Sequence, residues 1–129
     1  MFRFEELIVY QDALDLIDSV YNYTRKWPRE ELFGLTDQFK RASVSIALNI
    51  AEGTSRGTKE FLHFLDLARG SCYECVAVIT IAKRRQLIDE KEFLECSEQI
   101  EKIARKISAL KKSLRSTMND ERSTINHKL

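Results

Sequence analysis

Residues 38–74 read QFKRASVSIALNIAEGTSRGTKEFLHFLDLARGSCYE, and this stretch decides the fold. Steps of four, four and three residues lead from Arg41 to Glu52, so polar side chains share one face of a helix that is otherwise rich in small residues. Gly57 is expected to cap this helix in the left-handed conformation, and Thr58 to cap the next one. The stretch therefore predicts two helices joined by a tight turn.

Apolar residues recur at helical spacing on both sides of this stretch, and no segment shows the alternation of a strand. Pro28 ends the first apolar segment, because proline cannot continue a helix. Four helices are expected, over about residues 5–27, 31–57, 58–85 and 89–118. The last helix has the most regular stripe, made of Phe93, Cys96, Ile100, Ile103, Ile107, Leu110 and Leu114.

Short connections between these helices predict an all-α, antiparallel, up-down-up-down four-helix bundle. Charge supports this order, because residues 1–24 carry five acids and one base, whereas residues 102–115 carry six bases and no acid. Antiparallel first and fourth helices would place these two segments side by side. The sequence predicts one domain over residues 1–118 and a flexible polar tail over residues 119–129.

The composition excludes several classes of protein. With 129 residues, of which 43% are hydrophobic and 32% are charged, the chain fits one soluble domain. No apolar run is long enough for a bilayer, and acids occur near the N-terminus where a signal peptide would be apolar. An odd number of cysteines, three, does not suggest a disulfide framework. We expect a cytoplasmic protein with reduced thiols and no membrane partner.

The polar residues of the 38–74 stretch have two interpretations. In the preferred one they form a buried structural network that fixes helix register, because buried polar groups need hydrogen-bond partners. The alternative is a carboxylate pair, Glu52 and Glu74, placed for acid–base or metal chemistry. The expected network consists of Arg41, Asn49, Glu52, Ser71 and Glu74.

Other catalytic patterns are weak. Cys72 and Cys75 have the spacing of half a zinc or redox site, but both lie on an apolar helical face and no second pair follows. His63 follows Glu60 at the spacing of a di-metal ligand pair, but this pair occurs singly. No serine has a histidine at a recognisable spacing. We expect no catalytic residue, no metal and no cofactor, and hence no enzyme.

Basic residues gather near the end of the third expected helix and in the second half of the fourth. As a cationic surface they would bind RNA or DNA phosphates without sequence preference. The competing interpretation is a solvated helix end that is favoured by the helix dipole, and the net charge of only +1 supports it. The candidate contacts are Lys83, Arg84, Arg85, Lys102, Arg105, Lys106, Lys111 and Lys112.

Several segments together resemble a known family. The run from Gln38 to Ile46, the motif N-I-A-E-G at residues 49–53, Lys59-Glu-Phe61 and the run from Ala68 to Ser71 are similar to the four-helix-bundle proteins encoded in 23S rRNA intervening sequences. The likeness extends over nearly the whole chain. It implies a non-catalytic homo-oligomer, a pentameric barrel of bundles. A related branch, the accessory proteins of diversity-generating retroelements, uses a strongly basic barrel to bind nucleic acid and a reverse transcriptase.

Two functions of different classes follow from these observations. The first is an oligomer that binds RNA or DNA through the basic residues of the third and fourth helices. The second is a protein-interaction scaffold that recruits a protein partner without nucleic acid, with the basic residues serving only solubility.

Overall fold

The computed structural model describes residues 2–128, and for Arg3 and residues 123–128 it describes the backbone alone. Four α-helices make up most of this range, and no strand occurs in it, so the expected all-α four-helix fold is confirmed. Two short 3-10 helices precede and follow the first α-helix. In chain order the elements are η1 (Arg3–Glu6), α1 (Ile8–Arg25), η2 (Arg29–Glu31), α2 (Leu35–Thr54), α3 (Thr58–Arg84) and α4 (Glu90–Lys128).

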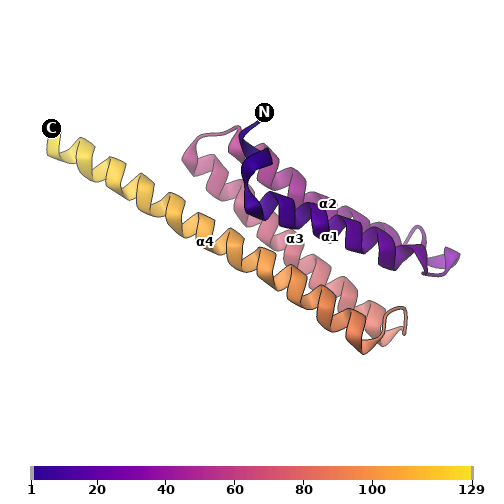
Figure 1. The fold of residues 1–129 in the computed structure, drawn as a ribbon. Helices are drawn as coiled ribbons and strands as arrows, with labels where there is room; N and C mark the ends of the chain where they lie inside the picture. Colours follow the sequence, from indigo (N-terminus) through magenta and orange to yellow (C-terminus); the bar gives the residue numbers. More distant parts are fainter. Residues whose placement is uncertain (1, 129) are drawn as a thin grey trace.

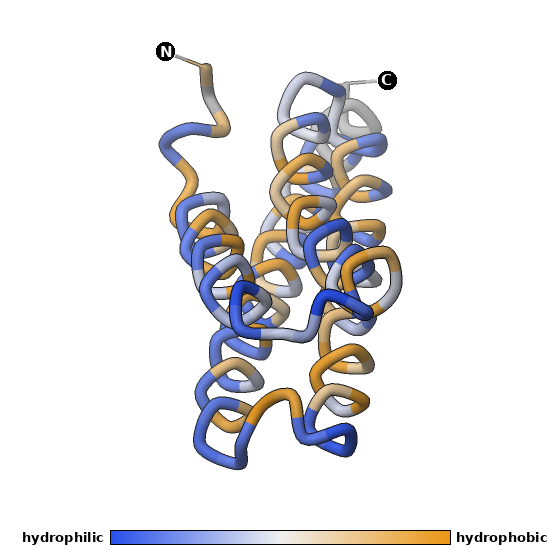
Figure 2. Tube along the Cα trace, turned by 90° about the vertical axis from the view of Figure 1, so that its right-hand side faces the viewer, coloured by the Kyte–Doolittle hydropathy of each residue, from blue (hydrophilic) through white to orange (hydrophobic). Residues whose placement is uncertain are grey.

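One hydrophobic core lies between the four helices. α2 and α3 make the most extensive contact, and among the α-helices that touch one another α1 and α4 make the smallest (Figure 1). Hydrophobic and hydrophilic segments alternate along every helix, as expected for helices with one apolar stripe (Figure 2). Fully buried side chains come from all four helices and include Leu16, Phe39, Ile46, Leu65, Ile79, Ile100, Ile103 and Ile107.

The N-terminal segment forms a separate turn, so the expectation of a continuous helix from about residue 5 is wrong. Leu7 is extended, with φ −74° and ψ 127°, and it interrupts the helix before α1 begins. The side chain of Gln11 donates a hydrogen bond of 3.1 Å to the carbonyl of Glu5, across this break. The ring of Phe4 packs edge-on against Tyr10 at a centroid distance of 4.9 Å. These contacts hold η1 against the first turns of α1.

The connection between α2 and α3 differs from the expected capping. Gly57 has φ −69° and ψ 167°, so it is not left-handed, and the prediction of a glycine cap for α2 is wrong. Instead, the amides of Ser55 and Arg56 bond to carbonyls three residues earlier, which tightens the last turn. Thr58 is the first residue of α3, not its N-cap, and the N-cap position has no side-chain hydrogen bond.

The connection between α3 and α4 has well-formed caps at both ends. The amide of Leu87 donates a hydrogen bond of 2.8 Å to the carbonyl of Ala82, and the amide of Gln86 donates one of 3.0 Å to the carbonyl of Lys83. This is the Schellman pattern, and Gln86 takes the left-handed position with φ 64°. α4 begins with a capping box, in which Asp89 and Glu92 each accept a hydrogen bond from the other's amide.

Gln86 gives a first testable prediction. Replacing Gln86 with glycine should raise the free energy of unfolding by about 0.5–1 kcal/mol, because glycine has no Cβ to oppose a left-handed conformation. Urea denaturation of both proteins at one protein concentration measures the difference. Gln86→Ala is the control and should not stabilise the fold, since alanine meets the same steric cost. A stabilisation of equal size in both variants would contradict this explanation.

α4 is longer than expected. Residues 119–128, predicted as part of a flexible polar tail, continue the helix to Lys128. No glycine or proline occurs after Gly70, so no residue type with a strong helix-breaking tendency ends α4 earlier. The described side chains of residues 119–122 are exposed, in agreement with their polar character. The end of α4 projects beyond the other three helices (Figure 1).

Candidate functional site

The structure joins two members of the expected polar network through a third residue, Ser45. The side-chain amide of Asn49 donates to the carbonyl of Ser45 at 2.9 Å and to its hydroxyl at 3.0 Å. The hydroxyl of Ser71 donates to the hydroxyl of Ser45 at 2.9 Å and so links α3 to α2. Small side chains at this contact allow the two helix backbones to lie close together. The Asn49–Ser45–Ser71 contact therefore sets the register between α2 and α3.

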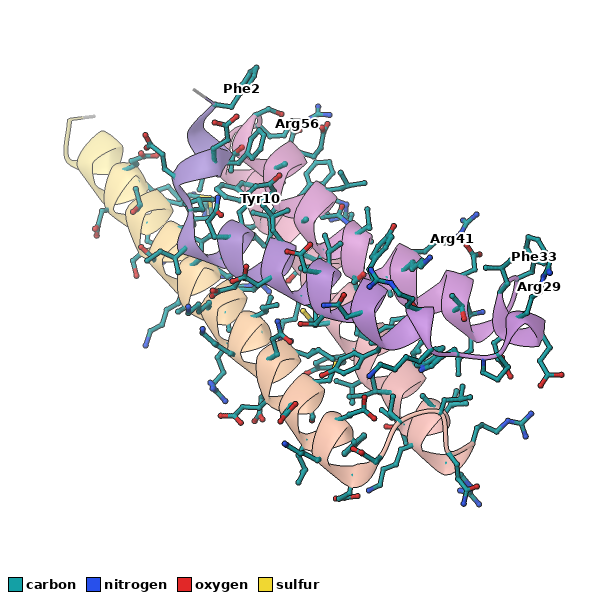
Figure 3. The ribbon with its side chains drawn as sticks, turned by 45° about the vertical axis from the view of Figure 1, so that its right-hand side comes forward. Phe2, Tyr10, Arg29, Phe33, Arg41 and Arg56 are labelled. Atoms are coloured by element: carbon teal, nitrogen blue, oxygen red, sulfur yellow. The ribbon has the colours of Figure 1, made fainter. Side chains whose placement is uncertain are left out.

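Arg41, Glu52 and Glu74 lie outside this contact, so the network predicted for them is wrong. The side chain of Arg41 is 80% exposed and its Nε lies 3.0 Å from the Asp37 carboxylate, on the outer side of α2 (Figure 3). Glu52 is exposed and accepts a hydrogen bond of 2.5 Å from Arg56, one turn later. Glu74 is exposed and has no ion pair within the described part of the chain.

These positions follow from the helical geometry of α2. Its fully buried side chains include Phe39, Ile46 and Ile50, and the charged residues point away from them. The alternative reading, a catalytic pair of Glu52 and Glu74, has no supporting contact, because Glu52 is engaged by Arg56. Within the residues whose side chains are described, no three His, Cys, Asp or Glu side chains come together in a way that could hold a metal ion.

The three cysteines are buried free thiols, which agrees with the interpretation of Cys72 and Cys75 as packing residues. Burial raises the pKa of the Cys72 thiol to about 12 and that of Cys96 to about 12. Burial and the neighbouring thiols raise the pKa of Cys75 still further. The thiols are therefore protonated at neutral pH, and a protonated thiol is neither a good nucleophile nor a metal ligand.

Five of the eight candidate phosphate-binding residues are engaged with acids. Lys102 and Lys106 lie 3.7 Å and 2.5 Å from the Asp12 carboxylate of α1, which confirms the expected contact between the acidic first helix and the basic fourth helix. Lys83 pairs with Glu90 at 2.5 Å. The other two pairs are Arg105 with Glu101 and Lys111 with Asp66.

Lys111 is not available to a nucleic acid, because it is only 8% exposed and its ammonium binds Asp66 of α3. The prediction of Lys111 as a phosphate contact is therefore wrong, and this residue instead joins α4 to α3. Arg84, Arg85 and Lys112 are exposed and have no ion pair among the described residues. Three of the eight candidate residues are thus exposed without an acidic partner in the described part of the chain.

A surface that the sequence analysis did not single out lies on the outside of α2 and α3. Leu48 and Leu67 each lie one helical turn from the Ser45–Ser71 contact, on the side of the α2–α3 connection. Large apolar side chains on this face are between 44% and 62% exposed. Tyr73, Ala77 and Ile81 recur at steps of four on α3, away from its core stripe, and this spacing is the signal that could have revealed part of the surface. We call this surface the α2–α3 outer face, and it is defined by Leu48, Leu67, Tyr73 and Ile81.

Comparison with known proteins identifies the family. A family model described as 23S rRNA-intervening sequence protein matches residues 5–109. The chain belongs to the 23S rRNA-intervening sequence protein family. The resemblance inferred from the sequence is therefore confirmed, and the family match ends before the projecting part of α4.

This 23S rRNA-intervening sequence protein also shares its fold with a solved structure. That structure is a protein of unknown function from the S23 ribosomal protein family of Bacteroides thetaiotaomicron. The two chains are 19% identical, with a TM-score of 0.75 over 81% of this chain and 99% of the other. At this identity the likeness shows the fold alone. A comparison with curated proteins gave no match.

The structure explains the N-I-A-E-G motif of this 23S rRNA-intervening sequence protein. Asn49 bonds to Ser45 at the α2–α3 contact, and Glu52 binds Arg56 on the surface. Gly53 lies where α3 packs closely, because a Cβ built there would meet the Phe61 ring at 2.7 Å. Asn49 and Gly53 of the motif therefore support the packing of α2 on α3.

Proposed function

We propose that this protein is a non-enzymatic, cytoplasmic homo-oligomer that serves as a protein-interaction scaffold. Its subunits are antiparallel up-down-up-down bundles, and they assemble through the α2–α3 outer face into a pentameric barrel. The observation that carries this proposal is the set of large apolar side chains exposed on that face. Exposed apolar surface of this kind is typical of sites that bind another protein surface.

Further features support the proposal. The connections between helices are short, and Asp12 of α1 pairs with Lys102 and Lys106 of α4, as an antiparallel order of the helices requires. The buried, protonated thiols fit a reducing compartment and a role other than catalysis. The chain belongs to the family whose resemblance implies a barrel of bundles in the sequence analysis. None of the described helices is both long and apolar enough to cross a membrane.

Charge substitution on the outer face tests the assembly. The double variant Leu67→Glu, Ile81→Glu should dissociate the oligomer, because each subunit contact would bury unpaired carboxylates. Light scattering should show five times the 15.1 kDa chain mass for the unmodified protein and one chain mass for the variant. Leu94→Glu is the matched control on α4, where the leucine is also exposed. A monomeric unmodified protein, or equal dissociation of the control, would refute assembly through this face.

The partner is tested by purification from the native host. If a second protein co-purifies with this chain in a constant molar ratio after nuclease treatment, the result supports the proposed scaffold function. Loss of all bound material on nuclease treatment would refute it in favour of the second candidate.

The second candidate is an oligomer that binds RNA or DNA. The specific observation in its favour is the exposure of Arg84, Arg85 and Lys112 without ion pairs among the described residues. In a symmetric oligomer, each subunit would contribute the same three exposed cations, so the cationic surface would grow with the number of subunits.

Salt-dependent filter binding tests this candidate. Binding of duplex DNA should weaken steeply as salt rises, and the double variant Arg84→Ala, Arg85→Ala should reduce the slope of log affinity against log salt by about 2. Lys91→Ala removes one exposed charge near the start of α4 and should leave the slope unchanged. If neither duplex DNA nor ribosomal RNA fragments are retained at low salt, the candidate fails.

A further inference from the structure

A pocket lies at the end of the bundle where α1 passes into α2. Its volume is about 300 Å³, at the lower end of the range for small-molecule sites. Every lining residue comes from α1, from α2 or from the connection between them, so the pocket is separate from the basic surface of α3 and α4. The lining contains three basic residues and no acidic one. It consists of Tyr21, Thr24, Arg25, Trp27, Pro28, Arg29, Leu32, Thr36 and Lys40.

The three cations of this pocket have no acidic partner among the described side chains. Arg25, Arg29 and Lys40 form no ion pair within the part of the chain that the structure describes. The neighbouring Arg41, by contrast, is paired with Asp37. Three like charges around one pocket repel one another, and a bound anion would convert this repulsion into attraction.

Fixed side chains surround these charges. The ammonium of Lys40 lies 4.6 Å from the centroid of the Tyr21 ring, which keeps the lysine at the pocket. Trp27 is 7% exposed, and its ring stacks on Phe39 at 5.8 Å between centroids. Its indole nitrogen is buried without a hydrogen-bond partner among the described residues, although buried donors normally have one. The hydroxyl of Thr24, also in the wall, already donates to the carbonyl of Val20.

We propose that this pocket binds a phosphate monoester. A phosphate monoester carries nearly two negative charges at neutral pH and three acceptor oxygens, which suits three unpaired cations. The guanidinium groups of Arg25 and Arg29 can each donate two parallel hydrogen bonds to phosphate oxygens, while Lys40 adds a third charge. The organic part of the ligand lies against Tyr21 and Leu32. The site goes beyond the scaffold function and uses none of the residues proposed for assembly.

A phosphate monoester can come from a free small molecule or from the 5′ end of a nucleic-acid strand. Trp27 lies in the pocket wall and is the single tryptophan of the chain, so its fluorescence reports on occupancy. We expect saturable quenching or enhancement by adenosine monophosphate, and none by adenosine. Tighter binding of a 5′-phosphorylated oligonucleotide than of its 5′-hydroxyl form would identify a strand end as the source. Equal binding of these two oligonucleotides, together with binding of the free nucleotide, would identify the small molecule.

The variants test whether the three cations hold the phosphate. Arg29→Ala and Lys40→Ala should each weaken the binding of adenosine monophosphate about tenfold, as for a lost charge-assisted hydrogen bond. Lys26→Ala is the matched control, because Lys26 lies between Arg25 and Trp27 in sequence but does not line the pocket. The affinity of this variant for adenosine monophosphate should change by less than about twofold.

Three results would overturn the proposal. The first is no saturable change with adenosine monophosphate or inorganic phosphate at millimolar concentration. The second is equal binding of adenosine and its monophosphate. The third is an equal loss of affinity in Lys26→Ala and Arg29→Ala, which would indicate general surface charge instead of a site. All three are independent of whether the protein forms oligomers through the α2–α3 outer face.

Discussion

Replacement of Phe39 with alanine should lower the free energy of unfolding by about 3–5 kcal/mol, the largest stability effect we expect in this protein. The Phe39 side chain is fully buried, and its ring stacks on Trp27 at a centroid distance of 5.8 Å and an angle of 16°. The substitution removes apolar contacts and leaves a cavity between α2 and the end of α1. The surrounding helices cannot fill this cavity without moving, so the full cost remains.

Denaturant unfolding followed by Trp27 fluorescence measures this loss. Protein concentration must be the same in all experiments, since any assembly would stabilise the folded chain by mass action. Phe33→Ala is the control, because Phe33 is 93% exposed and its removal should change stability by less than about 0.5 kcal/mol. Similar losses in both variants would mean that Phe39 is not a core residue in solution.

Gly53→Ala should lower the free energy of unfolding by about 1–3 kcal/mol through overpacking. The added Cβ would lie 2.7 Å from Cδ1 of Phe61 and 3.0 Å from Cβ of Phe64, and both atoms belong to α3. Phe61 is buried and cannot rotate away freely. Alanine favours a helix over glycine by about 1 kcal/mol, which offsets only part of this cost.

A double-mutant cycle separates the clash from other effects. In a Phe61→Leu background the Gly53→Ala substitution should cost less than in the unmodified protein, because the smaller side chain leaves room for the new Cβ. Thermal or chemical unfolding of the four proteins gives the coupling energy. Additive effects, with no coupling, would show that the ring of Phe61 is not what Gly53 accommodates.

The helical stripes could be predicted from the sequence because burial follows a simple period. Cys96, Ile100, Ile103 and Ile107 recur at steps of three and four, and all four are buried in α4. The break at Leu7 could not be predicted in this way, since the apolar pattern runs through it without interruption. The extended conformation there depends on contacts of η1 with Gln11 and Tyr10, which local spacing does not encode.

The surroundings of the polar residues were harder to predict. Helical spacing shows which residues share a face of a helix, but it does not show whether that face points to a neighbouring helix or to solvent. Arg41, Asn49 and Glu52 lie on neighbouring parts of one helix surface, yet only Asn49 is close enough to α3 to join the contact with Ser71. Arg41 and Glu52 each have an opposite charge four residues away, which satisfies them without burial.

The ion pairs between helices could likewise be predicted only in part from the sequence. The basic run in α4 could be matched in general to acidic α1, but the particular role of Asp12, which accepts two lysines, depends on the packing of helices that are far apart in the chain. The pocket with Arg25, Arg29 and Lys40 was missed for the same reason, because α1 and α2 bring its cations together in space.

The length of α4 has a consequence for the whole particle. The end of α4 extends beyond the other helices in the described part of the chain (Figure 1). Cyclic symmetry repeats every subunit feature at equal intervals about one axis. A closed ring of these bundles would therefore carry one projecting helix end per copy. A single large partner would then be able to contact several of these helix ends at once.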